Sequence, residues 1–253
     1  DITDTGAGQL LITGITNLSA AAANDIILDA VNNDFDVGNS GDAITVVDAN
    51  DVTLVDANQM IIASIASTAG NVSASTLAGA LTVLSSGPVN VISTTGAGTV
   101  TLSATGGNLV VNDGVSADTG KVTLTSVGAG NDVTFGVDGD VTTTSGEIEV
   151  NAADAIVMNT GTVLNAGDDI IDLNAVGNIQ LAQVTTTSNS IAGGSEAVNI
   201  NSGGAITDDN AGTNNVTTGA AGRLVIDAVN GVGDVTNGLE TSVGSIDIDN
   251  TTM

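Results

Sequence analysis

Hydrophobic and polar residues alternate in short runs along most of the chain. Residues 122–124 (VTL), 148–150 (IEV) and 246–248 (IDI) each place two aliphatic side chains on either side of a polar one. A period of two residues is typical of β-strands, with one face apolar and the other polar. Gly, Asn and Asp separate the runs and supply the backbone geometry of tight turns. The pattern predicts short strands joined by sharp corners.

The order strand, turn, strand, turn, strand recurs along the chain. It is clearest in residues 120–146 and is repeated in 146–168 and 169–190. Such recurrence predicts a solenoid in which each repeat stacks on the one before. The first strands are predicted to begin near Leu10, Ile26, Ile44, Ile61, Leu81, Val100, Val122, Ile148, Ile171, Val198, Leu224 and Ile246.

These starting points predict about twelve coils, spaced by about 18 residues before Val100 and about 24 after it. Second strands are expected at Ile15, Phe35, Val52, Val72, Val89, Leu109, Val133, Ile156, Ile179, Ile206 and Val232. Third strands are expected at Val115, Val141, Val163, Val184, Val216 and Leu239. We therefore expect one parallel β-solenoid over residues 1–253, with a narrow short-repeat half (1–98) and a three-sided long-repeat half (99–253).

The composition supports a regular, narrow interior. Hydrophobic residues make up 42% of the chain but aromatic residues only 1%, so aliphatic side chains must fill the core. Identical aliphatics stacked on one another can fill a solenoid, whereas irregular globular cores usually need larger side chains.

The charge is strongly negative. Two cations, Lys121 and Arg223, face 29 carboxylates, giving a formal charge of −27. This argues against nucleic acids and anionic membranes as partners and favours divalent cations. No apolar run is long enough to span a bilayer, and the absence of cysteine excludes disulfides and thiol chemistry.

Carboxylates gather at the expected corners. Stacked turns can offer calcium the six to eight oxygen ligands that it needs, and unrelieved like charges one coil apart are destabilising. The alternative is that Asp acts as a turn former on a solvated face. The candidate calcium ligands are Asp34, Asp36, Asp48, Asp51, Asp132, Asp138, Asp140, Asp168, Asp169, Asp172, Asp208 and Asp209.

Ordinary strand sequences stand at both ends of the chain. Ile2 and Leu10 at the start, and Ile246 and Ile248 at the finish, carry the apolar pattern of the interior repeats. Unpaired strand edges invite another chain, and a head-to-tail contact that does not close produces a filament. We expect these residues to be assembly ends.

Residues 222–243 (GRLVIDAVNGVGDVTNGLETSV) resemble the repeats of filamentous-haemagglutinin-type and other bacterial β-strand-repeat surface proteins. The resemblance rests on Leu224, Ile226 and Ala228, a Gly-Val-Gly turn at 231–233, and Leu239. It implies a secreted right-handed parallel β-helix that acts in adhesion or the extracellular matrix.

The function expected from these features is structural: a stiff, acidic extracellular fibre, extended end to end and stabilised by calcium. The alternative is an adhesin stalk or surface-layer component that binds a partner. A polysaccharide-active enzyme is more remote, because the chain lacks His, Cys, Tyr and Trp and only a carboxylate pair such as Asp168 and Asp169 is available for catalysis. We expect no enzyme activity.

Overall fold

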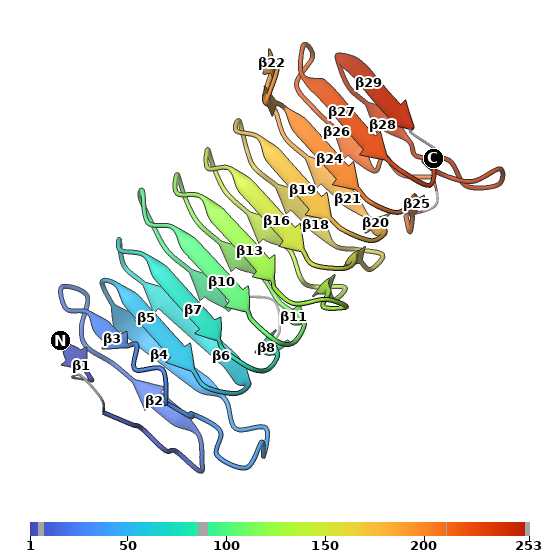
Figure 1. Cartoon of the computed structure of the whole chain (residues 1–253). Helices are drawn as coiled ribbons and strands as arrows, with labels where there is room; N and C mark the ends of the chain where they lie inside the picture. Colours follow the sequence, from blue (N-terminus) through green and yellow to red (C-terminus); the bar gives the residue numbers. More distant parts are fainter. Residues whose placement is uncertain (5–7, 86–90, 211, 251–253) are drawn as a thin grey trace.

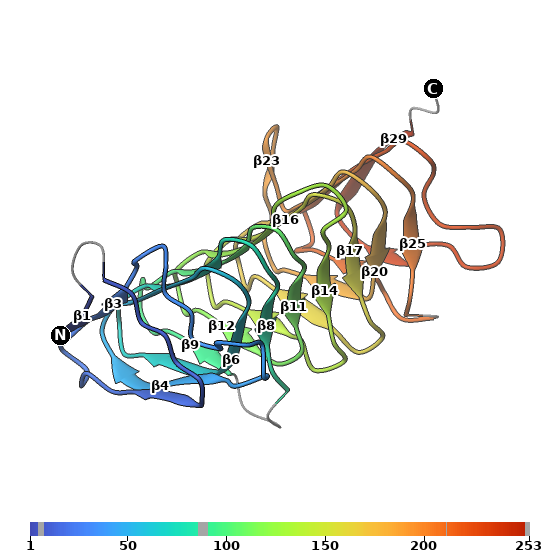
Figure 2. The ribbon, with the colours of Figure 1, turned by 60° about the horizontal axis from the view of Figure 1, so that its bottom comes forward.

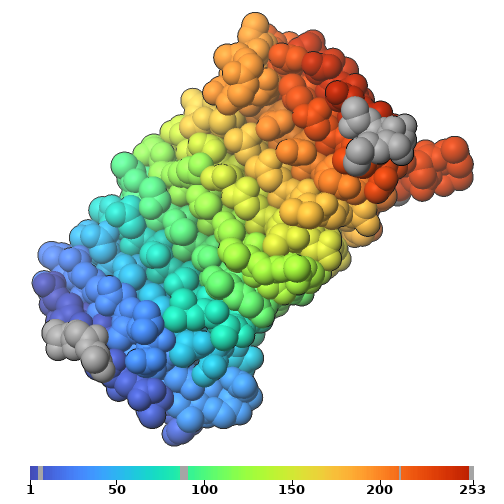
Figure 3. All heavy atoms as spheres, viewed as in Figure 1, coloured from blue at the N-terminus to red at the C-terminus, as the bar shows by residue number. Residues whose placement is uncertain are grey.

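The computed structural model describes residues 1–4, 8–85, 91–210 and 212–250, which form an elongated rod of stacked coils (Figures 1 and 3). Neighbouring coils are joined by parallel strand pairs, and no helix occurs among the described residues. The rod has about ten turns. The predicted all-β parallel solenoid is confirmed at this level.

The first face of the rod is an 11-stranded parallel sheet with one strand from each coil. Its strands pair in register, so that Val100 lies beside Val122 and Val122 beside Ile148. The strands are β1 (Ile2–Thr3), β3 (Ile26–Leu28), β5 (Val52–Asp56), β7 (Val72–Thr76), β10 (Val100–Ala104), β13 (Val122–Ser126), β16 (Ile148–Ala152), β19 (Ile171–Ala175), β24 (Val198–Ser202), β27 (Arg223–Ala228) and β29 (Ser245–Asn250).

The second and third faces belong to one 16-stranded sheet that bends around the rod (Figure 2). The second face contains β8 (Leu81–Val83), β11 (Leu109–Val111), β14 (Val133–Phe135), β17 (Ile156–Met158), β20 (Ile179–Leu181) and β25 (Ile206–Asp208). The third face contains β9 (Ile92–Ser93), β12 (Val115–Ser116), β15 (Val141–Thr142), β18 (Val163–Asn165), β21 (Gln183–Thr185), β26 (Val216–Thr217) and β28 (Thr241–Ser242).

The two faces meet in the long strand β6 (Met60–Ser67), which pairs with β8 through its first half and with β9 through its second. Below it lie β4 (Ile44–Ala49) and β2 (Thr16–Leu18). The coil therefore separates into three faces after β6, earlier than residue 99. An antiparallel hairpin, β22 (Ile191–Ala192) and β23 (Ser195–Glu196), leaves the stack between β21 and β24.

The interior is a continuous column of aliphatic side chains. Alternate residues of each first-face strand are buried, as in the pattern of β13 and β16, and Phe35 and Phe135 are the two largest buried residues. Parallel stacking places like side chains over like, which explains how a core with almost no aromatics is filled.

The structure assigns several strands to other faces than the sequence pattern suggested. Val52 and Val72, expected in second strands, begin first-face strands, whereas Ile44 and Leu81 lie on the other faces. The period of two identifies a strand but not its face, which depends on the lengths of the corners. The expected second strand at Val89 lies outside the described residues.

Consecutive apolar residues also left the inward position ambiguous. Ile62, not Ile61, is buried in β6, and Leu164, not Val163, stacks on Val141 in β18. The expected third strand at Leu239 is formed instead by Thr241, which pairs with Val216.

The repeat length does not change near residue 99. Neighbouring first-face strands are closest in sequence from Val52 to Val72, 20 residues, and most distant from Val72 to Val100, 28 residues. Both extremes lie in the first half of the chain. The first face has eleven strands rather than the expected twelve.

Candidate functional site

The acidic corners form ladders of hydrogen bonds along the rod. At the corner before the first face, the Asp1 side chain accepts a hydrogen bond from the Asp25 amide at 3.0 Å, and Asp25 accepts one from the Asp51 amide at 3.1 Å. Asp51 then accepts from the Asn71 amide at 2.6 Å, and Asn71 from the Thr99 amide at 3.0 Å. Each bond joins one coil to the next.

The second-face corner follows the same rule. Asn108 accepts from the Asp132 amide at 2.9 Å, Asp132 from the Ala155 amide at 3.0 Å, and Asn178 from the Ala205 amide at 2.8 Å. The residue immediately before a strand supplies the acceptor, and its equivalent in the next coil toward the C-terminus supplies the amide.

The third-face corner repeats the arrangement. Asp140 accepts from the Val163 amide at 2.7 Å, and Asn215 accepts from the Glu240 amide at 3.0 Å. Because Asp and Asn take the same place in these ladders, the shared requirement is a side-chain oxygen acceptor rather than a negative charge.

Two of the candidate calcium ligands lie in the N-terminal coils within a closed hydrogen-bond network. The buried Asp36 accepts hydrogen bonds from the amides of Ser40, Gly41 and Asp42 and from the side chains of Ser40 and Gln59. Burial alone would raise the pKa of Asp36, but these hydrogen bonds outweigh it and lower the pKa to about 2. Asp34 accepts from the Asp36 amide and the Asn58 side chain.

The fully buried Asp56, which the sequence did not single out, accepts from the amides of Phe35 and Asn58. Burial raises its pKa, and the nearby Asp34 and Asp36 carboxylates raise it further.

The remaining candidates are scattered rather than gathered. Asp138 and Asp168 are exposed. Asp48 accepts from the Thr68 hydroxyl, and Asp169 from the adjacent Ile170 amide. Asp209 fixes the Thr160 amide and hydroxyl from two coils away.

Burial raises the pKa of two further candidates. Nearby Asp138 and Asp113 raise the pKa of Asp140 further, and Glu147 and Glu149 do the same for Asp172. Across the described residues, no three acidic residues gather in a group that could hold a metal ion. Calcium binding stays a prediction.

Asp208 differs from the other acids because it occupies a core position. It stacks on Leu181 in the row that also contains Val111 and Phe135. Its Oδ1 accepts from the Asn210 amide and the Asn215 side chain, both at 2.6 Å. Its Oδ2 is buried, and within the described part of the chain it has no hydrogen-bond partner.

Both cations of the chain lie at the first-face corner and bridge coils. Lys121 Nζ contacts Glu147 at 2.7 Å and Glu149 at 2.6 Å. Arg223 contacts Asp247 in the next coil at 2.5 Å and Glu196 of the β22–β23 hairpin at 3.9 Å.

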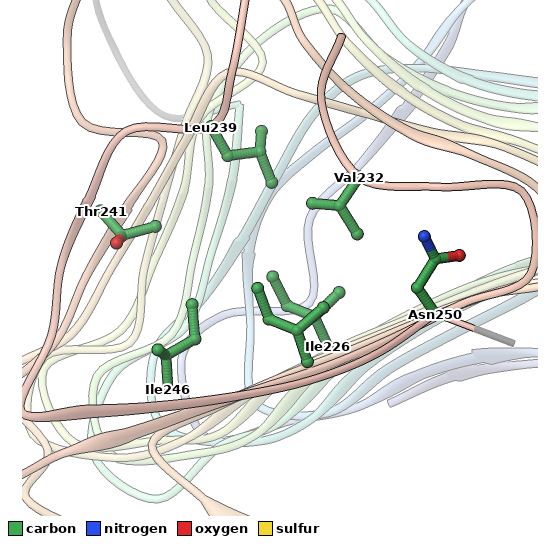
Figure 4. Close-up of a pocket in the computed structure, with 7 residues that line it drawn as sticks. Ile226, Val232, Leu239, Thr241, Ile246 and Asn250 are labelled. Atoms are coloured by element: carbon green, nitrogen blue, oxygen red, sulfur yellow. The ribbon is translucent and has the colours of Figure 1, made fainter.

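The C-terminal end of the described rod is open. Ile246 and Ile248 of β29 are 47% and 48% exposed, whereas Leu224 and Ile226, directly beneath them in β27, are 0% and 1% exposed. These residues line an apolar hollow together with Val232, Leu239 and Thr241, whose side chains converge in Figure 4.

The N-terminal end also presents apolar residues. Ile2, Leu10, Ile12 and Leu18 are only partly buried against the core, and Leu11 is 58% exposed. The four predicted assembly ends, Ile2, Leu10, Ile246 and Ile248, therefore lie at the two ends of the stack, Leu10 outside any strand.

Sequence reasoning missed two polar residues at these ends. Thr16 Oγ1, in the first coil, and Glu240 Oε2, beside the open C-terminal end, are buried without a hydrogen-bond partner among the described residues. No sequence signal marks them, because their significance depends on position in the stack.

None of the described residues forms a helix long and apolar enough to cross a membrane. No family model matches the chain, and neither the curated proteins nor the solved structures include a match. The resemblance to bacterial β-strand-repeat surface proteins therefore stays a prediction.

Proposed function

We propose that this solenoid is a structural element of an extracellular or cell-surface fibre and that it extends by end-to-end stacking of its coils. The observation that carries the proposal is the open C-terminal end, where the aliphatic core of the rod continues to an exposed strand. Exposed strand edges pair readily with another chain, and a head-to-tail contact between two different ends propagates instead of closing.

Cations belong to the same proposal because both ends carry acids, Asp1 and Asp4 at one and Asp247 and Asp249 at the other. Screening of these charges should favour the contact. Calcium is the ion that the sequence predicts, and we propose that it acts chiefly by neutralising acidic surface. Sodium chloride at the same ionic strength should then replace much of its effect.

The test is self-association of the 253-residue chain, followed by light scattering and negative-stain imaging across protein and salt concentrations. We expect filaments that lengthen with salt. Ile248→Asp should abolish them because it places a charge in the apolar hollow. Val235→Asp is the matched control, since Val235 is fully exposed in a loop near the same end. A chain that remains monomeric at high concentration in every salt would refute the proposal.

The projecting β22–β23 hairpin favours a second candidate, an adhesin stalk that binds a partner (Figure 2). Ile191 is 62% exposed at this hairpin. Binding to a glycan surface that disappears when residues 191–196 are replaced by a Gly-Ser turn would favour this function.

A further inference from the structure

The two ends of the rod are complementary parts of one coil. In the chain up to Asn250, the last coil has only its first-face strand, β29, because the second face ends at Val232 and the third at β28. The first coil is the reverse: its second and third faces are formed by residues 10–12 and β2, but its first-face strand, β1, has two residues.

We propose that a second copy of this chain completes the last coil, with β29 of one copy replacing β1 of the next. β29 would then pair with β3 of the next copy, and residues 10–12 and β2 of that copy would cover the hollow. This inference rests on the proposed end-to-end function and specifies how the contact forms.

The apolar pattern favours replacement over simple stacking. In β1, Ile2 lies beside Ile26, and the register then places Asp4 beside the buried Leu28. If Ile246 takes the place of Ile2, Ile248 falls beside Leu28. Replacement therefore extends the apolar column across the junction and removes the Asp1 and Asp4 carboxylates from it.

The levels of the strands give a second argument. If β1 stacked on β29, the second and third faces of the two copies would be left one coil apart, about 4.8 Å. The hollow lined by Val232 and Leu239 would then remain open. Replacement of β1 brings all three faces into contact together.

The corner ladder supplies a third argument. Glu240 is the last residue of the third-face ladder, and its Oε2 is buried without a partner among the described residues. The next residue in this column is Asn17 of the following copy, because Leu18 and Thr241 occupy the same stacking position at opposite ends of the third face.

The amide of Asn17 points in the required direction. Thr16 donates its amide to Ala43 in the second coil, and successive amides of a strand point to opposite sides. The Asn17 amide therefore faces the open N-terminal end, where β2 has no strand partner in the described structure. The ladder rule thus matches the unused acceptor of one end with a donor at the other.

Engineered disulfides test the proposal, since the chain has no cysteine of its own. Replacement places residue 247 of one copy beside residue 27 of the next, whereas simple stacking places it beside residue 3. Neighbouring strands are about 4.8 Å apart, within the Cα separation that a disulfide spans. Within one chain these positions lie at opposite ends of the rod, so any disulfide between them must join two copies.

We expect the Ile27→Cys/Asp247→Cys variant to give a ladder of covalent oligomers on oxidation and the Thr3→Cys/Asp247→Cys variant to give none above background. Deletion of residues 1–4 should leave assembly intact or lower the critical concentration. A ladder from the Thr3 pair, or loss of assembly on deletion, would overturn strand replacement while preserving end-to-end extension. Filaments without cross-links in either variant would also overturn it. A wild-type chain that stays monomeric would overturn both proposals.

Discussion

Replacement of Asp132 separates two roles for the corner carboxylates. Asp132 Oδ1 accepts the Ala155 amide of the next coil at 3.0 Å in a partly buried corner. A typical hydrogen bond contributes about 1 kcal/mol net, so Asp132→Ala should lower the free energy of unfolding by about 1 kcal/mol. Asp132→Asn keeps an oxygen acceptor and removes one negative charge, so we expect a change within about 0.5 kcal/mol.

The assay is urea unfolding combined with hydrogen exchange of the Ala155 amide, each with excess calcium or with a chelator. Exchange of this amide should accelerate in Asp132→Ala but not in Asp132→Asn, and the chelator should make no difference. Asp138→Ala is the control because Asp138 is exposed. If Asn destabilises the rod as much as Ala does, and only in calcium, the hydrogen-bond interpretation is refuted and Asp132 is a calcium ligand.

Three further predictions concern the corners. Gly146→Ala should cost about 2 kcal/mol or more, because a Cβ there overlaps the Gly120 carbonyl oxygen one coil below, whereas Gly14→Ala, in open space, should be tolerated; thermal melts compare them. Acid should destabilise the N-terminal coils as pH falls from 3.8 to about 2, since the lowered pKa of Asp36 means that its stabilisation is present above this window and lost within it; hydrogen exchange near residues 36–42 measures this, and an unchanged slope in Asp36→Asn would contradict it. Lys121→Gln should cost about 0.5 kcal/mol at low salt and less at high salt, because its two ion pairs are partly exposed; a loss independent of salt would argue against a Coulombic role.

The strand period could be read from the sequence because it depends on neighbouring residues. Val122, Ile148 and Ile246 were each placed correctly as the first apolar residue of a first-face strand. Face assignment failed at Val52 and Val72 because stacking joins residues 20 to 28 positions apart through corners of variable length. No local pattern encodes which strand will lie above which.

The role of the acids was hidden for the same reason. Asp132 looks like a turn residue in the sequence, and its partner, the Ala155 amide, lies in the next coil. Asp208 follows Ile206 at the alternating spacing of a strand, which identifies an inward position, but a carboxylate there was interpreted as part of a turn. Chemistry that repeats along the rod axis becomes visible only after the stacking register is known.

The direction of the corner ladders has a consequence for the whole rod. In every corner bond described above, the side-chain acceptor belongs to one coil and the amide donor to the next coil toward the C-terminus. A stack built by this rule cannot have equivalent ends, because one finishes on unused acceptors such as Glu240 and the other on unused donors such as the Asn17 amide. Two unlike ends make a head-to-tail contact that generates a further identical site with each addition. Glu240→Leu, which removes the acceptor, should therefore weaken assembly, whereas Glu240→Gln, which keeps an oxygen, should preserve it; equal losses in the critical-concentration measurement would contradict the ladder rule at the junction.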